Sequence, residues 1–198
     1  VVANLCRRML GSEDPAPEAM LVRLSAHPAV WTRACVVHFA GRQQVPGCGK
    51  MAQSLLRDPD PLVRETALHA LARVDKAAAR DAAKSLADDP SPGVRRSADR
   101  LARGKGVKKE KAMLSTMERL LFLKSVSFFE SLEGEDLLEL AEVTRVQQVA
   151  AGDALYEQGG DADSLYVVVR GQVVIQRGAN GKRVDLAYIG EREYFGEM

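Results

Sequence analysis

Residues 27–40 read HPAVWTRACVVHFA, and a related pattern returns as DPLVRETALHALAR at residues 60–73 and as SPGVRRSADRLARG at residues 91–104. When the copies are aligned on their shared proline, valine and alanine, they return at nearly equal intervals. A pattern that returns in this way predicts one supersecondary unit copied along the chain. The first half of the sequence is therefore expected to be a stack of repeats.

The aligned residues indicate that each copy begins a helix. Proline costs little in the first helical turn, because its missing N–H would have no partner there. Valine and alanine four residues apart lie on one helical face. The alignment places Trp31 where the later copies carry Arg64 and Arg95, and we expect Asp58 and Asp89 to cap the following helices. Other helical stretches lie between the copies, so each repeat is predicted to be a helix pair that buries its apolar face against the next.

The pattern D-P-x-P-x-V-R-x-x-A resembles the HEAT repeat family in its short bacterial form, over roughly residues 16–103. The resemblance implies an α-solenoid that acts as an interaction scaffold and holds a protein partner. Some enzymes, such as pigment lyases, also carry these repeats, but no residue here points to that chemistry.

The second half changes its periodicity. A basic stretch at residues 104–112 is predicted to be a linker, and residues 113–198 form a second module. Short helices open this module, and β-branched runs separated by glycine and aspartate turns follow. Asn180-Gly181 predicts a two-residue hairpin, and Gly171 predicts a tight turn with positive φ. Many short strands with regular turns favour an antiparallel β-roll.

Three stretches, FFESLEGEDLLELAE, AGDALYEQGGDADSLYVVVRGQVVIQ and YFGEM, resemble in this order the opening part of a cyclic nucleotide-binding domain. Bacterial catabolite regulators, protein-kinase regulatory subunits and gated channels share this family. The resemblance covers residues 115–198 and rests on Phe129, Leu132, Gly152, Gly159, Tyr166, Gly171, Phe195, Gly196 and Glu197. One departure is Arg192, which stands where the family often carries glycine.

The resemblance implies a ligand site at the FGE motif. Gly196 would let the backbone approach the ligand, and the N–H groups of a following helix would face the phosphate. Glu197 would accept a hydrogen bond from the ribose 2′-hydroxyl. The ligand is expected to be a cyclic nucleotide, cAMP rather than cGMP. The family also supplies an arginine further along the chain than Met198, so we expect Met198 to be a cut and the site to be half present. The sequence begins with Val1 and not with methionine, so we expect Val1 to be a cut as well.

Composition limits the other functions. The 198 residues carry a net charge of +1, which predicts no nucleic-acid partner. The sequence contains no run of 18 apolar residues, so it predicts no membrane-spanning helix. Residues 1–112 have a net charge of +8 and residues 113–198 one of −7, as expected for two different modules. Three cysteines without a CxxC pair favour a reducing compartment, and the three histidines, His27, His38 and His69, lack metal-ligand spacing.

Together these patterns predict a multidomain α + β protein. An α-solenoid of HEAT-like helix pairs (residues 1–103) precedes a truncated, jelly-roll-like antiparallel β-roll with short flanking helices. The predicted function is a cyclic nucleotide-responsive regulatory module in the cytoplasm, without catalytic residues, metal or cofactor. Two alternatives stay open. One is the cytosolic tail of a membrane transporter resembling nucleotide (ATP/ADP) translocases, with its membrane part upstream; the other is an interaction scaffold with a degenerate, non-binding roll.

Overall fold

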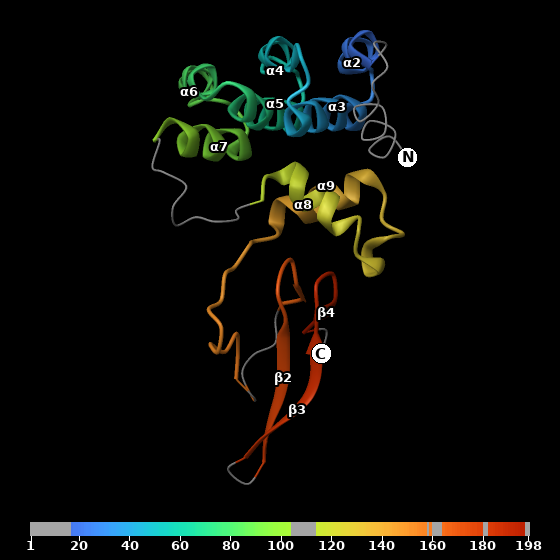
Figure 1. Ribbon diagram of the computed structural model, residues 1–198, viewed down its shortest axis with the longest axis vertical. Helices are drawn as coiled ribbons and strands as arrows, with labels where there is room; N and C mark the ends of the chain where they lie inside the picture. The colour runs from blue at the N-terminus through green and yellow to red at the C-terminus, as the bar shows by residue number, and fades with distance from the viewer. Residues whose placement is uncertain (1–16, 104–113, 158, 160–163, 180–181, 197–198) are drawn as a thin grey trace. The chain divides into compact units, whose positions relative to one another are not determined.

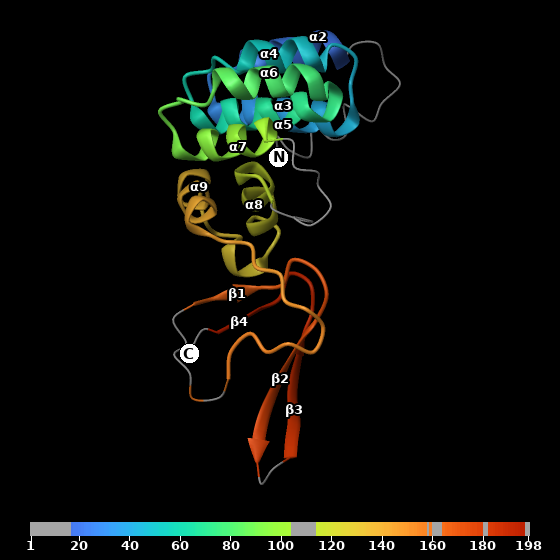
Figure 2. The ribbon, with the colours of Figure 1, turned by 90° about the vertical axis from the view of Figure 1, so that its left-hand side faces the viewer.

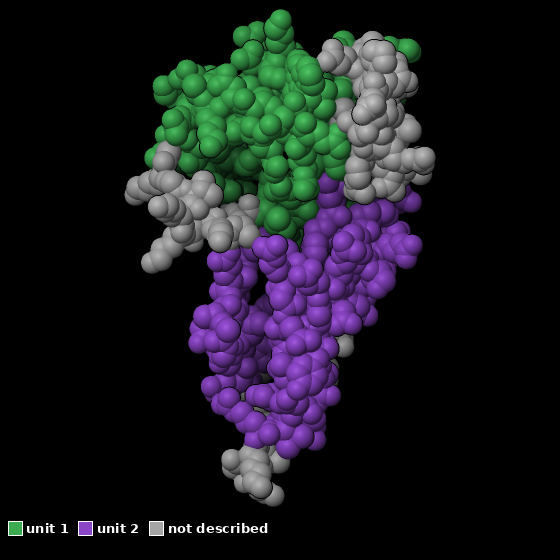
Figure 3. All heavy atoms as spheres, in the orientation of Figure 1, with its two compact units in different colours: residues 1–120, 134–144 green, residues 121–133, 145–198 purple. Residues whose placement is uncertain are grey.

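The computed structural model describes residues 17–103, 114–157, 159, 164–179 and 182–196. Its chain packs into two compact units, residues 1–120 with 134–144 and residues 121–133 with 145–198 (Figure 3). Helix α8, Thr116–Leu123, passes from the first unit to the second after Leu120.

Unit 1 is a stack of helix pairs. Its first six described helices are α2 (Pro17–Ser25), α3 (Val30–Gln43), α4 (Cys48–Leu55), α5 (Pro61–Val74), α6 (Lys76–Ser85) and α7 (Pro92–Ala102). Figures 1 and 2 show α2, α4 and α6 in one layer and α3, α5 and α7 in a second layer. This arrangement confirms the helix pairs expected from the repeating pattern.

The register of the first repeat differs from the predicted one. Helices α3, α5 and α7 begin at equal intervals along the chain, so Arg33, and not Trp31, is the equivalent of Arg64 and Arg95. The later copies carry two prolines at this turn and the first copy carries only Pro28. The sequence alignment matched Pro28 with the wrong member of the pair, which shifted the first copy by two residues.

The capping role expected for Asp58 and Asp89 is also wrong. The N-cap of α5 is Asp60, whose carboxylate accepts a hydrogen bond from the backbone N–H of Leu62 at 2.9 Å. Asp58 instead accepts two hydrogen bonds from the guanidinium of Arg33, from Nε at 2.7 Å and from Nη2 at 2.9 Å. These aspartates therefore join one repeat to the next, because a bidentate arginine pair fixes both distance and orientation.

Apolar packing completes the stack. One buried cluster draws on α5, the end of α6 with the turn after it, and α7; its members are Leu68, Ala83, Leu86, Val94 and Ala98. Helices α3 and α5 approach so closely that a Cβ on Gly41 would lie 2.6 Å from Cβ of Ala70. The small residues on these faces thus set the distance between the repeats.

The beginning of α8 and helix α9, Gly134–Val143, also belong to unit 1. Ser115 and Glu118 form a capping box, in which the Glu118 N–H donates to Ser115 Oγ and the Ser115 N–H donates to Glu118 Oε2. Glu118 also pairs with Arg73 of α5 at 2.7 Å. Arg119 donates from Nη1 to the carbonyl oxygen of Thr144, directly after α9, at 3.1 Å. These contacts fasten both helical segments within the unit.

Unit 2 contains the β structure. After the short 3₁₀ helix η1 (Ser127–Phe129) its strands are β1 (Tyr166–Val167), β2 (Val173–Ala179), β3 (Lys182–Ile189) and β4 (Tyr194–Phe195). Strand β1 pairs antiparallel with β4, and β2 pairs antiparallel with β3.

The turn predictions can be compared with this sheet region. Ala179 pairs with Lys182, so the β2–β3 connection has two residues, as predicted; Asn180 and Gly181 themselves lie outside the described residues. Gly171 has φ of +93°, which confirms the positive φ expected there. The predicted fold class, helical repeats followed by an antiparallel β-roll, is confirmed. The linker at 104–112 lies outside the described residues, and the predicted domain limits stay predictions.

Candidate functional site

The β1–β4 pair positions the predicted ligand turn. Tyr166 faces Phe195 and Val167 faces Tyr194 in this antiparallel ladder. The backbone of Val168 extends the pairing. Its N–H donates to the carbonyl oxygen of Glu193, and its carbonyl oxygen accepts the N–H of Arg192. The last residues before the FGE motif are therefore held by backbone hydrogen bonds.

Gly196 follows β4 directly and has φ of +93°. A Cβ at this position would lie 2.6 Å from the carbonyl oxygen of Ser164 and 3.3 Å from Cδ2 of Tyr166. Residues with a side chain rarely adopt this backbone conformation, and here there is also no room for one. The structure thus explains the glycine, whereas Glu197, the second predicted site residue, lies outside the described residues.

An aromatic stack supports this turn from one side. The rings of Tyr166 and Phe195 are stacked with centroids 5.2 Å apart, and Tyr156 stacks on Tyr166 at 5.9 Å. Phe195 is buried, while Tyr156 is 46% exposed. The stack therefore anchors the end of β4 in the interior and leaves Tyr156 partly exposed at the surface.

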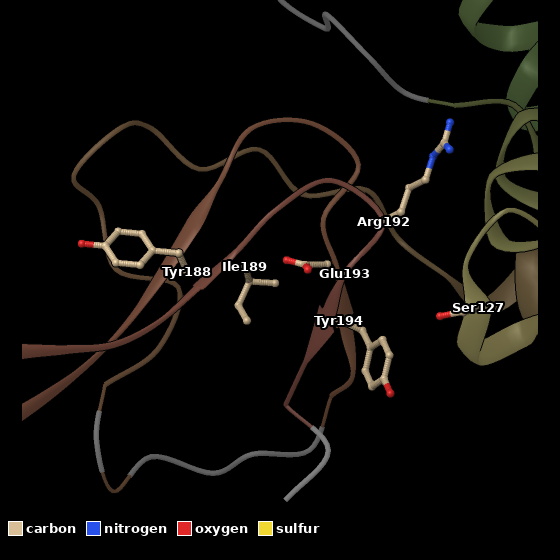
Figure 4. A pocket seen from close by; sticks show the side chains of 6 residues that line it. All are labelled: Ser127, Tyr188, Ile189, Arg192, Glu193 and Tyr194. Atoms are coloured by element: carbon tan, nitrogen blue, oxygen red, sulfur yellow. The ribbon is translucent and has the colours of Figure 1, made fainter.

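A pocket of about 360 Å³ lies beside the turn that precedes β4 (Figure 4), lined by Ser127, Tyr188, Ile189, Arg192, Glu193 and Tyr194. Arg192 has φ of +69°, so the arginine takes the left-handed conformation that a glycine would adopt more easily. The side chains of Tyr188 and Arg192 point away from each other (Figure 4). The reacting groups of a catalytic site converge on one point, and the side chains that line this pocket do not.

The phenol of Tyr188 forms a hydrogen bond within the β2–β3 hairpin that carries it. Its hydroxyl donates to Asp185 at 2.6 Å, and Gln176 Nε2 donates to the same carboxylate at 2.7 Å. These two hydrogen bonds, that of Tyr188 first, lower the pKa of Asp185, and the carboxylate raises the pKa of Tyr188. The tyrosine is thus a hydrogen-bond donor here and not a base.

Two other kinds of site are absent from the described part of the chain. It holds no group of three His, Cys, Asp or Glu side chains placed to bind a metal ion. It also holds no helix that combines the length and the apolar character needed to cross a membrane. Among the described residues, the turn at Gly196 is therefore the best-supported candidate site.

Comparison with known families divides the chain as the periodicity does. Residues 17–102 match the model of HEAT repeats, and residues 146–198 match the model of the cyclic nucleotide-binding domain. In this chain, HEAT repeats therefore precede a cyclic nucleotide-binding domain. The turn at Gly196 lies within the matched part of that domain.

One protein of known function is similar to part of this chain. It is the cAMP-dependent protein kinase type II regulatory subunit of Drosophila melanogaster, 26% identical over 76 residues. The alignment covers 38% of this chain and 20% of the relative, so the chain spans about a fifth of that protein. No solved structure matches the chain at a significant level.

Sequence reasoning missed the arginine–aspartate pairs between the repeats. The same sequence interval separates Arg33 from Asp58 and Arg64 from Asp89. That interval was visible in the sequence, but the shifted register of the first copy concealed it. With the arginines aligned, the spacing alone would have predicted contacts between neighbouring repeats.

Proposed function

We propose that the protein is a cyclic nucleotide-responsive regulatory module coupled to a HEAT-repeat scaffold, without catalytic activity. The ligand would bind at the turn of Gly196, and Glu197 would accept a hydrogen bond from the ribose 2′-hydroxyl. Binding would change the conformation of the roll, and the repeats would hold the protein partner that responds.

The observation that carries the proposal is the crowded backbone at Gly196. A Cβ there would lie 2.6 Å from the carbonyl oxygen of Ser164, at a φ that favours glycine. Glycine lets the chain make this turn, and successive backbone N–H groups at a turn of this kind can bind an anion. The match of this region to the cyclic nucleotide-binding domain supports a cyclic phosphate as that anion.

We further propose cAMP, rather than cGMP, as the ligand, because the relative from Drosophila melanogaster is named as cAMP-dependent. The odd number of cysteines, three, supports a reducing compartment, and we place the protein in the cytoplasm. The relative is named as the regulatory subunit of a kinase, which supports a non-catalytic role.

The test is a calorimetric titration of cAMP and cGMP into the natural full-length protein and into residues 1–198. Glu197→Gln should weaken cAMP binding about tenfold or more, since a hydrogen bond to a charged group contributes about 1.5–3 kcal/mol. The control is Glu133→Gln, which removes the same charge from an exposed glutamate of unit 2. Chromatography of the recovered nucleotide should show it unchanged.

If the folded full-length protein binds neither nucleotide, the sensor proposal fails and the roll is an interaction scaffold. If Glu133→Gln weakens binding as much as Glu197→Gln does, the assigned role of Glu197 is wrong. Conversion of the nucleotide during incubation would overturn the proposed absence of catalysis.

A further inference from the structure

Neighbouring repeats are joined by arginine side chains at equivalent positions, Arg33 and Arg64, which bind in the same way. These two residues and the equivalent Arg95 are called the arginine ladder. Arg33 donates from Nη1 to the carbonyl oxygens of His27 and Pro28, both at 2.8 Å, and uses Nε and Nη2 for the carboxylate of Asp58. Its Nη1 thus fixes the turn of its own repeat, and its fork, defined as Nε with Nη2, reaches the next repeat.

Arg64 repeats this geometry one repeat later. Its Nη1 donates to the carbonyl oxygens of Asp58 and Pro59 at 2.8 Å, and its fork pairs with Asp89 through two bonds of 2.8 Å. The side chains of both accepting aspartates are nearly buried. Each filled fork therefore binds a carboxylate that is largely shielded from water.

Arg95 completes only half of the pattern. Its Nη1 donates to the carbonyl oxygens of Asp89 and Pro90, as the earlier arginines do at their own turns. Among the described residues no carboxylate pairs with its fork, and the residue that follows Arg95 at the interval of the filled pairs is Leu120. The ladder thus ends on a guanidinium oriented by its own turn, with its carboxylate-binding edge unfilled by the described part of the chain.

We propose that the fork of Arg95 binds a carboxylate of a protein partner, presented by an aspartate in an Asp-Pro turn at the start of a helix. Asp58 and Asp89, which bind the forks of Arg33 and Arg64, are both followed by proline, so an Asp-Pro turn is the form of carboxylate that this kind of fork binds in the chain. Preorganised bidentate donors suit a carboxylate, and the partner helix would add the next member of the stack. The inference rests on the proposed scaffold role of the repeats and is independent of nucleotide binding.

Charge around Arg95 favours an acidic partner. Helix α7 also carries Arg96 and Arg100, and Arg103 follows its end, whereas Asp99 is its single acidic residue. A basic surface of this kind attracts acidic segments and speeds their association.

A second copy of this chain does not supply the missing carboxylate through its first repeat. The position equivalent to Asp58 and Asp89 is His27, which precedes Asp58 by the same interval that separates the two aspartates. His27 Nδ1 accepts the N–H of Ala29 at 3.0 Å, just as Asp58 Oδ1 accepts the N–H of Asp60 at 2.9 Å. The turn is thus kept, but it presents an imidazole, so the partner is a protein of different sequence.

The first experiment is a side-chain NMR measurement on residues 1–198 labelled with nitrogen-15. The Nε–H groups of Arg33 and Arg64 should exchange slowly with water, whereas that of Arg95 should show no protection. If Arg95 is protected in the free chain, the fork is filled by the chain itself and the proposal is overturned. Glu110→Gln then shows whether the protecting carboxylate is Glu110, the single acidic residue in the sequence 104–113.

The second experiment adds an unlabelled peptide of residues 76–102, which carries the Asp89-Pro90 turn between two helical segments, without nucleotide. The Arg95 Nε–H signal should shift and gain protection. A peptide with Asp89→Asn should bind roughly tenfold more weakly, since it loses a charge-assisted bidentate pair, and a peptide with Asp88→Asn should bind as well as the unchanged one.

Protein variants complete the test. Arg95→Lys keeps the charge but loses the fork, so it should weaken peptide binding as Asp89→Asn does, while Arg23→Gln, at an exposed position of the first described helix α2, should not; circular dichroism checks that both variants fold. No binding at about 1 mM peptide, a weak affinity on the usual scale, overturns the proposal. Equal binding of the Asp89→Asn peptide overturns it too, and neither result bears on the nucleotide titration.

Discussion

Asp89 accepts both fork hydrogen bonds of Arg64, from Nε and from Nη2, each at 2.8 Å. The side chains of the two residues are 4% and 11% exposed, and the Asp89 carboxylate also accepts the backbone N–H of Ser91. The hydrogen bond from Arg64 is the main reason why the pKa of Asp89 lies below its usual value. One aspartate thus joins α5 to the turn that begins α7.

We therefore expect Asp89→Asn to lower the free energy of unfolding by about 3 kcal/mol, because one partner of a shielded ion pair is removed and the Arg64 charge is left unpaired. Urea unfolding followed by circular dichroism measures this loss. The matched control is Asp88→Asn, which removes the same charge from an exposed neighbour and should change stability by less than about 0.5 kcal/mol. Equal effects of the two variants would show that the pair does not stabilise the repeat stack.

His38 gives unit 1 a stability that depends on pH. The side chain is buried, its Nε2 has no hydrogen-bond partner among the described residues, and burial lowers its pKa to about 4. An unfolded histidine titrates near pH 6.5, so the unfolded state binds more protons between pH 6.5 and pH 4. This contribution is fully present above pH 6.5 and is lost as the pH falls through that window.

The expected loss from His38 is about 2 kcal/mol between pH 8 and pH 5, a figure that follows from the two pKa values. Urea unfolding at both pH values should show it in the unchanged protein. His38→Met removes the titrating ring and should flatten the difference. A pH dependence that survives His38→Met would assign the effect to other groups.

Most of the fold could be predicted because its signals are local. Proline at helix starts and the change of period from helical to alternating are properties of neighbouring residues. The register of the first repeat could not be settled in this way, because Pro28 alone fits two alignments. Contacts between repeats decide it, through the bidentate pair of Arg33 and Asp58.

The candidate site was less accessible to sequence reasoning. The need for glycine at position 196 depends on the carbonyl of Ser164, which is brought close only by the pairing of β1 with β4. The positive φ of Arg192 likewise depends on the hydrogen bond from its N–H to the carbonyl of Val168. Local propensity opposes an arginine there, and the tertiary structure overrides it.

Gly41 sets the closest approach between α3 and α5. A Cβ at this position would lie 2.6 Å from Cβ and 2.7 Å from Cα of Ala70, and the backbone of a packed helix cannot move aside cheaply. Gly41→Ala should therefore lower the free energy of unfolding by about 2 kcal/mol. Gly49→Ala in α4 is the control, since its nearest atom would be Cγ2 of Val74 at 3.9 Å, and it should stabilise by up to about 0.5 kcal/mol. Thermal unfolding of both variants measures the contrast, and a neutral Gly41→Ala would disprove the tight packing.

Gly196 and Gly171 form a matched pair for the ligand turn. Both have φ of +93°, but a Cβ on Gly171 would meet nothing within 4 Å, whereas one on Gly196 would collide with the carbonyl of Ser164. Gly171→Ala should cost about 1 kcal/mol through backbone strain alone, and Gly196→Ala should cost clearly more because a steric clash is added.

The same pair separates stability from binding. Gly196→Ala must displace the backbone next to Glu197, so it should abolish cAMP binding in the natural full-length protein, whereas Gly171→Ala should keep it. Calorimetry on variants whose fold is checked by circular dichroism gives the answer. If a folded Gly196→Ala variant binds cAMP with unchanged affinity, the close backbone approach at this turn serves the packing of the roll and not the ligand.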